Sequence, residues 1–256
     1  MNRIGFIGVG ELALYTIRGV RAGGYLESIR LSPRNQQKAA LLAAEFNCQV
    51  EADNQSVVDN SDIIVIATRP DDCLDTLRQL RFHGNQLLLS VVAGVDRESL
   101  ATAINADIEI IRAMPVSSAE VGASPTLVYP PHPAVLDFFN HCGNSVPVES
   151  EDWFNQGSVL ACVYCWFFAL FDHLIQSTGE PRMPADISAK LVMGMAQGAA
   201  ELALARHPES PAEIAAGIAT EGTYSKLGLD WLQREAAFAP WQEACALLQK
   251  KLADSD

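Results

Sequence analysis

The chain has 256 residues, of which 49% are hydrophobic, 19% charged and 7% aromatic. This apolar content excludes global disorder and suffices for one large or two medium domains. The net charge of −13 excludes a protein that binds DNA or anionic lipid through a broad basic surface, although a single basic pocket for a small anion is compatible with it.

The N-terminus and the cysteines indicate the compartment. The opening MNRIGFIGVG enters an apolar strand pattern without the charged leader and cleavage site of a signal peptide, so we expect a cytoplasmic protein. The six cysteines are scattered over a chain too large to need disulfides, and we expect reduced thiols. Cys162 and Cys165 form a C-x-x-C pair in an apolar helix, where we expect buried packing. The five histidines lack ligand spacing, so no metal site is expected.

The first 150 residues alternate short β-rich runs with helical stretches. The predicted strands are residues 3–8, 28–32, 62–67, 86–91 and 108–113, with 126–129 and 145–148 as later edge strands and a loop at Pro130, Pro131 and Pro133. The predicted helices are residues 11–22, 36–46, 71–80 and 97–104. Continuous apolar strands that alternate with helices are typical of a parallel, doubly wound α/β sheet.

Beyond residue 150 only helices are predicted, at residues 151–177, 184–206, 211–219 and 224–253. We therefore expect a dinucleotide-binding α/β domain at 1–150 and an all-helical domain at 151–256. The uninterrupted apolar run of residues 157–171 is shorter than the roughly 20 residues that a bilayer requires. A helix that is apolar on all sides is expected to be buried, either inside the protein or between subunits.

The strongest local signal is the sequence G-x-G-x-x-A from Gly8 to Ala13, between the first strand and the first helix. The first glycine permits a tight turn, and the second lets the backbone approach a pyrophosphate. The small Ala13 lets the helix pack on the strand, and the helix N-terminus stabilises the phosphate charge. The pattern predicts a Rossmann-type dinucleotide site; a tight turn without a ligand is the alternative.

The end of the second strand indicates which dinucleotide. NAD-binding chains usually carry a carboxylate there for the ribose hydroxyls, whereas this chain reads Arg30-Leu31-Ser32-Pro33-Arg34-Asn35. Ser32 and Arg34 are suited to a 2′-phosphate, so NADP(H) is favoured over NAD(H). The alternative for Arg34 is an ordinary solvated loop charge.

With these residues in place, the chain resembles the pyrroline-5-carboxylate reductases, which reduce a cyclic imine to proline. The resemblance is carried by GFIGVGELA, by Asn54 in ADNQ, by Ala67-Thr68-Arg69-Pro70 with arginine for the family's lysine, by SVVAGV at 90–95, and by R-A-M-P at 112–115 followed by Val121-Gly122. It implies a Rossmann domain followed by helices that intertwine with a partner subunit, and hence a homodimer or higher homo-oligomer.

The resemblance also implies which residues bind the cofactor and the substrate. The cofactor residues are Gly8, Val9, Gly10, Glu11, Leu12, Ser32, Pro33, Arg34, Asn54, Ala67, Thr68, Arg69, Pro70, Ala93, Gly94 and Met114, and the substrate residues are Val116, Ser117 and Gly222. Ser225 stands where the family has the second threonine of S-P-G-G-T-T, whose hydroxyl binds the substrate near its nitrogen. Ser225, Thr223 and Tyr224 are therefore the candidate catalytic hydroxyls, although Thr223 and Ser225 are equally suited to cap the following helix.

The chain departs from the family in its substrate half. Val116-Ser117-Ser118 replaces Asn-Thr-Pro after R-A-M-P, and the small, polar helix turn S-G-S-G-P-A-Y has become bulky and apolar at residues 160–166. The sequence predicts an NAD(P)H-dependent reduction of pyrroline-5-carboxylate to proline by a protein that binds neither nucleic acid nor membrane. Two alternatives stay open: a reductase of a different, less polar imine or carbonyl compound, and a non-catalytic nucleotide-binding dimer.

Overall fold

The fold is that of a computed structural model, which describes residues 3–104, 106–177 and 183–253. The chain divides into two compact units. The N-terminal unit extends to Ala161 and takes in the chain again from Gln249, and the helical unit comprises Cys162–Leu248. The predicted domain boundary at residue 150 coincides with the start of helix α7, whereas the N-terminal unit continues eleven residues further, to Ala161.

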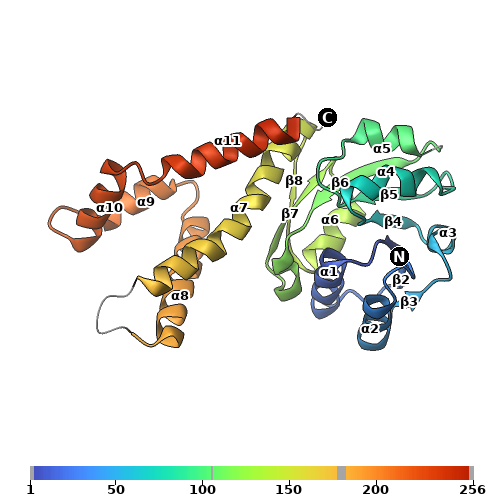
Figure 1. Cartoon of the computed structure of the whole chain (residues 1–256), viewed down its shortest axis with the longest axis horizontal. Helices are drawn as coiled ribbons and strands as arrows, with labels where there is room; N and C mark the ends of the chain where they lie inside the picture. The colour runs from blue at the N-terminus through green and yellow to red at the C-terminus, as the bar shows by residue number, and fades with distance from the viewer. Residues whose placement is uncertain (1–2, 105, 178–182, 254–256) are drawn as a thin grey trace. The chain divides into compact units, whose positions relative to one another are not determined.

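The N-terminal unit is built on one eight-stranded sheet (Figure 1). Its strands are β1 (Ile4–Ile7), β2 (Ile29–Leu31), β3 (Gln49–Val50), β4 (Ile63–Ile66), β5 (Leu87–Ser90), β6 (Glu109–Met114), β7 (Ser124–Tyr129) and β8 (Gly143–Pro147), in the spatial order β3-β2-β1-β4-β5-β6-β7-β8. Strands β1 to β6 are parallel, β7 is antiparallel to β6, and β8 is parallel to β7. The predicted α/β fold with a doubly wound, mainly parallel sheet is confirmed.

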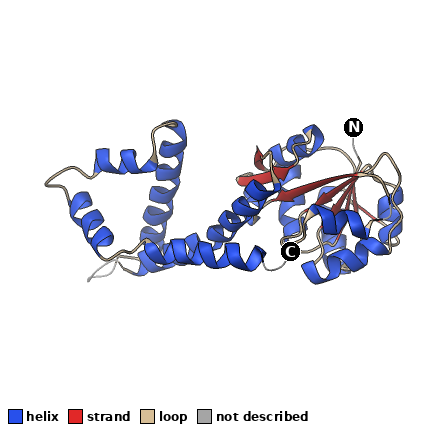
Figure 2. Cartoon of the chain, turned by 90° about the horizontal axis from the view of Figure 1, so that it is seen from above, coloured by secondary structure: helices blue, strands red, loops and turns tan. Residues whose placement is uncertain are grey.

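Helices cover both faces of this sheet (Figure 2). They are α1 (Glu11–Ala22), α2 (Gln36–Phe46), α3 (Asn54–Asp59), α4 (Pro70–Arg78), α5 (Arg97–Ala103) and α6 (Pro133–Asn140), with a 3₁₀ turn η1 (Ser117–Val121) after β6. Alternate strand residues supply two separate cores: Phe6 packs with α1, α2 and α6, and Ile7 with α3, α4 and α5. The continuous apolar strands are thus explained by burial on both faces.

Two details of the sequence prediction for this unit were wrong. Residues 130–132 form a loop as expected, but Pro133 begins helix α6, which was not predicted. Proline fits the first turn of a helix because its missing N–H would have no partner there. Strand β7 is not an edge strand, since α6 returns the chain and places β8 beside it. Helix α3 was also missed; it has only six residues, and Asp53 caps it by accepting a hydrogen bond from the Ser56 N–H.

The first turns of α7 (Glu151–Gln176) belong to the N-terminal unit because they pack on the sheet. Phe154, Ser158 and Val159 are buried there. Arg112 on β6 donates hydrogen bonds from Nη1 to Glu151 Oε1 at 2.7 Å and to Asn155 Oδ1 at 3.0 Å. This contact fixes the start of α7 against the end of the sheet.

The helical unit contains the rest of α7, α8 (Ala185–Ala205), α9 (Pro211–Ile218), α10 (Tyr224–Arg234) and most of α11 (Ala239–Ala253). Trp166 and Phe167 of α7 contact Trp241 of α11, with ring centroids 6.0 and 6.2 Å apart. The prediction of a single helix over 224–253 was wrong. The chain leaves the helical conformation at Ala236, which has φ +49°, and restarts as α11 just before Pro240.

A contact between α1 and η1 generates a stability prediction. A Cβ on Gly19 would overlap the Ala119 carbonyl oxygen, which is backbone and cannot move aside. We expect Gly19→Ala to lower the free energy of unfolding by about 1–3 kcal/mol, the usual cost of overpacking. Urea unfolding measures it. Gly84→Ala is the control, because a Cβ there has open space within 4 Å; an equal loss in both variants would contradict the prediction.

Candidate functional site: a nucleotide crevice at the end of the sheet

A crevice of about 810 Å³ opens at the carboxyl ends of β1, β2 and β4, where α1, α2 and α4 begin. It is lined by Ile7, Gly8, Val9, Gly10, Glu11, Ser32, Arg34, Asn35, Gln36, Lys38, Asn54, Ala67, Thr68, Arg69, Asp72 and Thr76. In open α/β sheets, ligands bind at this edge, where the strand order reverses direction. Here the order reverses between β1 and β4.

Gly8 and Gly10, the two glycines of the fingerprint, are required for different structural reasons. Gly8 has φ +96°, and a Cβ on it would lie 2.6 Å from the carbonyl carbon of Ala67, so the turn after β1 touches the backbone at the end of β4. Gly10 has an ordinary extended conformation, and a Cβ there would meet nothing within 4 Å. The space beside Gly10 is therefore a cradle within the crevice that a side chain would begin to fill, as a pyrophosphate site requires.

Helix α1 and helix α4 begin at the crevice without a side-chain cap. By contrast α2, α3 and α5 are capped by Asn35, Asp53 and Asp96, which accept hydrogen bonds from backbone N–H groups. The first N–H groups of a helix have no partner within the helix and point along its axis. At α1 they are thus available to an anion in the crevice, whereas α4 begins with Pro70, which has no N–H, and its Asp72 N–H donates to the Arg69 carbonyl at 3.1 Å.

Polar side chains from the segment after β2 hold the turn. The Gly8 N–H donates to Ser32 Oγ at 3.0 Å, and Asn35 Nδ2 donates to the Val9 carbonyl at 3.0 Å. Ser32 is only 1% exposed, and its hydroxyl oxygen accepts the Gly8 N–H of the turn. The hydroxyl proton can still be donated to a ligand. The end of β2 thereby orients the fingerprint as well as lining the crevice.

The crevice is locally basic although the chain is acidic. Three cations line it, Arg34, Lys38 and Arg69, against two carboxylates, Glu11 and Asp72, which leaves one positive charge in excess among the described lining residues. Lys38 Nζ lies 2.6 Å from Glu11 Oε1, and Arg34 Nη1 lies 3.3 Å from Asp72 Oδ2. The electrostatics are those of a site for a small, multiply charged anion.

The crevice brings together ten of the sixteen predicted cofactor residues, namely Gly8, Val9, Gly10, Glu11, Ser32, Arg34, Asn54, Ala67, Thr68 and Arg69. Leu12, Pro33, Pro70, Ala93, Gly94 and Met114 lie outside its lining. Sequence reasoning missed six lining residues, Ile7, Asn35, Gln36, Lys38, Asp72 and Thr76. Asn35 was detectable as the residue before an expected helix start, whereas the pairing of Lys38 and Asp72 with distant residues carries no local signal.

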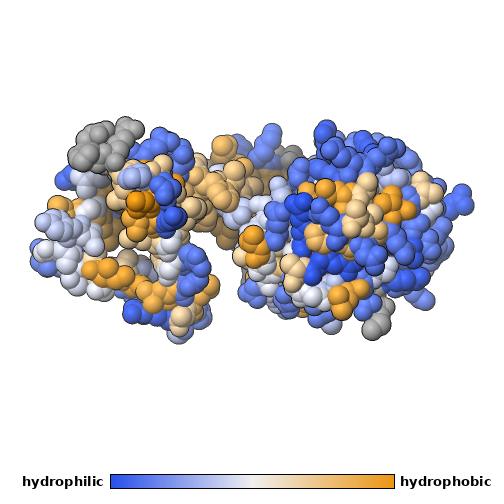
Figure 3. Space-filling model, turned by 90° about the horizontal axis from the view of Figure 1, so that it is seen from below, coloured by the Kyte–Doolittle hydropathy of each residue, from blue (hydrophilic) through white to orange (hydrophobic). Residues whose placement is uncertain are grey.

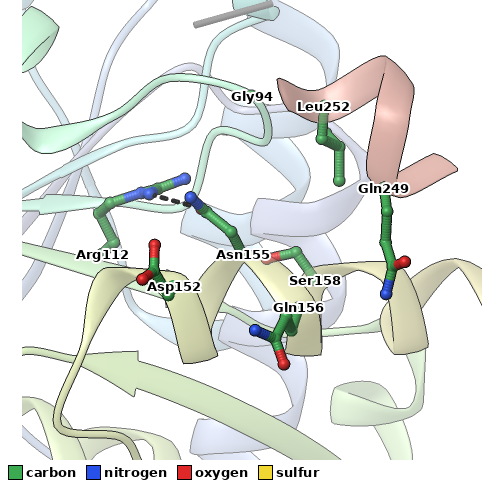
Figure 4. A pocket seen from close by; sticks show the side chains of 8 residues that line it. All are labelled: Gly94, Arg112, Asp152, Asn155, Gln156, Ser158, Gln249 and Leu252. Carbon is green, nitrogen blue, oxygen red and sulfur yellow. Dashed lines mark hydrogen bonds between the residues drawn. The ribbon is translucent and has the colours of Figure 1, made fainter. Parts of the chain in front are cut away.

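A second, smaller pocket of about 370 Å³ lies in the same unit, where Gly94 meets α7 and the end of α11 (Figure 4). It is lined by Gly94, Arg112, Asp152, Asn155, Gln156, Ser158, Gln249 and Leu252. Arg112 is 3% exposed, its Nη1 is engaged by Glu151 and Asn155, and its charge lies 4.5 Å from the centroid of the Phe154 ring. The guanidinium of R-A-M-P thus holds α7 on the sheet.

The segment after R-A-M-P is held by a buried hydroxyl pair. The Val116 N–H donates to Ser124 Oγ at 3.0 Å, and Ser124 Oγ lies 2.9 Å from Thr126 Oγ1. Both hydroxyls are fully buried on β7. Val116 and Ser117, the predicted substrate residues of this unit, are half-buried at the start of η1.

The predicted catalytic hydroxyls lie at the start of α10 in the helical unit. Thr223 caps that helix: its Oγ1 accepts from the Lys226 N–H at 3.2 Å and donates to the Thr220 carbonyl at 2.7 Å. Tyr224 and Ser225, in the first turn, are exposed, and Gly222 before them has φ +82°. The capping alternative is therefore correct for Thr223, and Ser225 presents its hydroxyl at the surface of the unit.

Thiol and metal chemistry find no support in the described part of the chain. Burial raises the pKa of Cys73 to about 11 and that of Cys142 to about 12, so neither is a thiolate at neutral pH. Cys162 and Cys165 are exposed, contrary to the expectation of buried packing, and burial followed by neighbouring thiols raises the pKa of Cys162. No group of His, Cys, Asp and Glu side chains among the described residues is arranged to hold a metal ion.

A glycine turn, the uncapped start of α1 and a basic crevice at the switch point of a doubly wound sheet define a Rossmann-type dinucleotide-binding protein. A family model described as NADP oxidoreductase, coenzyme F420-dependent, matches residues 3–94. The chain is 32% identical over 213 residues to pyrroline-5-carboxylate reductase of Escherichia coli K12, a match covering 77% of this chain and 78% of that protein. The chain belongs to the pyrroline-5-carboxylate reductase family and is an NAD(P)H-dependent oxidoreductase that acts on a C=N bond.

Solved structures agree in fold. Pyrroline-5-carboxylate reductase of Streptococcus pyogenes superposes with a TM-score of 0.86 at 22% identity, covering 98% of each chain. The Plasmodium falciparum pyrroline carboxylate reductase, solved with NADP bound, superposes with a TM-score of 0.87 at 18% identity, covering 99% of this chain and 98% of that one. The predicted Rossmann domain followed by helices is the fold of these proteins.

The cradle at Gly10 generates a prediction that separates ligand binding from folding. We expect Gly10→Ala to weaken binding of the dinucleotide at least about tenfold, because the added methyl group enters the cradle. Its unfolding free energy should fall by no more than about 1 kcal/mol, the usual cost of alanine at an N-cap, since the Cβ meets no atom of the chain. Titration calorimetry and urea unfolding measure the two quantities.

Gly8→Ala is the matched control. Its Cβ would collide with the Ala67 backbone at a positive φ, so this variant should lose stability as well as binding. Unchanged nucleotide affinity in Gly10→Ala would show that the pyrophosphate does not approach this turn.

Proposed function

We propose that this chain reduces pyrroline-5-carboxylate to proline with NADPH as the hydride donor. The observation that carries the proposal is its 32% identity over more than three quarters of the chain to an E. coli enzyme of that name, combined with an intact nucleotide crevice. The reaction adds a hydride to the imine carbon and a proton to the imine nitrogen, so the C=N π bond becomes a C–H and an N–H bond.

The preference for NADPH over NADH follows from the end of β2. Ser32, Arg34 and Asn35 follow that strand without a carboxylate, and Lys38 adds a second cation to the same crevice. Charge-assisted hydrogen bonds to a phosphate are stronger than those to a ribose hydroxyl. The Plasmodium falciparum relative was solved with NADP, which is consistent with this choice.

The nicotinamide cofactor supplies the hydride when it is bound. The protein's own residues position the substrate against the cofactor and support protonation of the imine nitrogen. The crevice residues hold the nucleotide, and β6 ends at Met114 on the same edge of the sheet, two residues before Val116. Ser225 is the proposed polar anchor for the substrate, because its hydroxyl is exposed whereas that of Thr223 caps α10. The first N–H groups of α10 can receive the substrate carboxylate.

The proposal is tested by NADPH oxidation with pyrroline-5-carboxylate, followed for the parent and for Ser225→Ala. We expect turnover by the parent, and a loss of at least about tenfold in kcat for Ser225→Ala with unchanged NADPH affinity, since a hydroxyl that assists protonation contributes about 10²-fold or more. Tyr224→Ala tests a shift of register by one residue.

Thr223→Ala is the control for a purely structural effect. It removes the cap and should lower the unfolding free energy by about 1 kcal/mol. If Ser225→Ala and Tyr224→Ala both keep parental turnover, the pocket assignment is wrong. If the parent oxidises NADPH only with bulkier, less polar imines, the apolar residues 160–166 have changed the substrate.

We also propose that the protein is a homodimer through its helical unit. Hydrophobic surface is visible over that unit (Figure 3). Phe168, Leu204 and Trp231 of the helical unit are exposed by 56%, 79% and 54%, and Leu160, at the edge of the N-terminal unit, by 66%. Ile214 and Ala219 are the only hydrophobic residues buried among the described part of this unit. A unit with so small a core is not stable alone and needs a covering surface.

Helix α7 allows a second explanation of this surface. It is long and apolar enough to cross a membrane by length and composition, and 11% of its most apolar window is buried. We favour the second copy of the chain, because exposed apolar residues are spread over α8, α10 and α11 as well as α7, whereas a single spanning helix would leave those uncovered.

Sedimentation velocity at micromolar concentration checks this proposal. We expect a dimer, and dissociation or loss of the helical signal for Phe168→Asp, which places a charge on the exposed face of α7. Leu26→Asp is the matched control, because Leu26 is 89% exposed in the N-terminal unit and should leave the dimer intact. A stable folded monomer, or flotation with lipid vesicles, would contradict the prediction.

A further inference from the structure

The cations of the crevice are already paired with carboxylates of the same chain. Arg34 lies in the loop after β2 and Lys38 in the first turn of α2, and their partners Asp72 and Glu11 lie in the first turns of α4 and α1. These are the two helices that begin at the crevice without side-chain caps. Both groups proposed to attract a phosphate thus have a competing anion within 3.3 Å.

The Arg34–Asp72 pair is weak enough to open. The Arg34 side chain is 75% exposed and that of Asp72 is 42% exposed, so water screens both charges. Exposed ion pairs of this kind contribute little to stability and rearrange readily. A phosphate that enters the crevice can therefore take Arg34 from Asp72, and the Asp72 carboxylate then stays beside the bound anion.

We propose that Asp72 is a specificity-determining residue that limits the preference for NADPH over NADH. It competes for Arg34 and repels the added phosphate, and both effects act only on the cofactor that carries a 2′-phosphate. This inference rests on the proposed assignment of Arg34 to that phosphate.

Asp72 differs in this respect from the other acidic residues near it. Glu11 competes for Lys38, but it stands at the start of α1, where the pyrophosphate common to both cofactors is proposed to bind, so its charge also acts on NADH. Asp75, one turn after Asp72 on α4, pairs with Arg78 of its own helix at 2.6 Å and does not line the crevice. Asp75 therefore offers a charge-matched control on the same helix.

The size of the effect follows from the charge balance. Replacing Asp72 by asparagine doubles the positive excess of the crevice from one to two and frees Arg34. A unit charge several ångströms from a phosphate in a solvated crevice, together with a released surface pair, changes affinity about three- to tenfold. The change should be largest at low ionic strength, because salt screens exposed charges.

The experiment titrates two probes, 2′,5′-ADP and 5′-AMP, into the full-length protein by calorimetry. The probes differ only in the 2′-phosphate and require neither the nicotinamide ring nor the imine. We expect Asp72→Asn to bind 2′,5′-ADP about three- to tenfold more tightly and 5′-AMP within twofold of the parent. Asp75→Asn should change neither, and Arg34→Ala should weaken 2′,5′-ADP alone, at least tenfold.

The outcomes separate this inference from the proposed function. If the parent prefers 2′,5′-ADP and Arg34→Ala abolishes that preference, but Asp72→Asn leaves it unchanged, the inference is overturned and the cofactor proposal stands. Equal gains for both probes in Asp72→Asn also overturn it, since they would indicate a general effect on α4. A parent that does not distinguish the probes overturns the NADPH preference, and this inference with it.

Discussion

The contact between the first fingerprint turn and the end of β4 is the constraint on which the crevice depends. Gly8 brings two backbones together at a positive φ that other residues adopt at a cost, and a Cβ there would lie 2.6 Å from the Ala67 carbonyl carbon. Ser32 joins the end of β2 to the same point by accepting the Gly8 N–H. The ends of β1, β2 and β4 are therefore held together around Gly8. As a consequence, α1 and α4 begin at the same crevice.

The acidic residues at the starts of α1 and α4 stabilise these helices but weaken the binding of an anion in the crevice. Carboxylates in the first turn of a helix are favourable because they oppose the positive end of its dipole, and Glu11 and Asp72 occupy such positions. At a phosphate site the same carboxylates are unfavourable. Lys38 and Arg34 moderate the conflict by pairing with them, so the two helices keep their acidic first turns while the crevice keeps a positive excess.

Features of the fold and the crevice were predictable from the sequence where the contacts that determine them are local in the chain. The bounds of α1 and α2 were predicted correctly because Gly10 and Asn35 mark their starts in the sequence itself. The break at Ala236 was not, because no glycine marks it and only the following Pro240 hints at a stop. The turn residues of the crevice were predictable from motifs, whereas Asp72 was not, since it meets Arg34 across 38 positions of the chain.

The two units differ in the size of their buried hydrophobic cores. The largest fully buried side chains, among them Phe6, Phe138 and Phe154, all belong to the N-terminal unit, which therefore has a full core of its own. The described helical unit buries little beyond Ile214 and Ala219. Burial of apolar area dominates folding stability, so the core of the first unit maintains the nucleotide crevice, whereas the proposed dimer would supply the cover that the second unit lacks. Nucleotide binding and the proposed assembly are thus separable in energy.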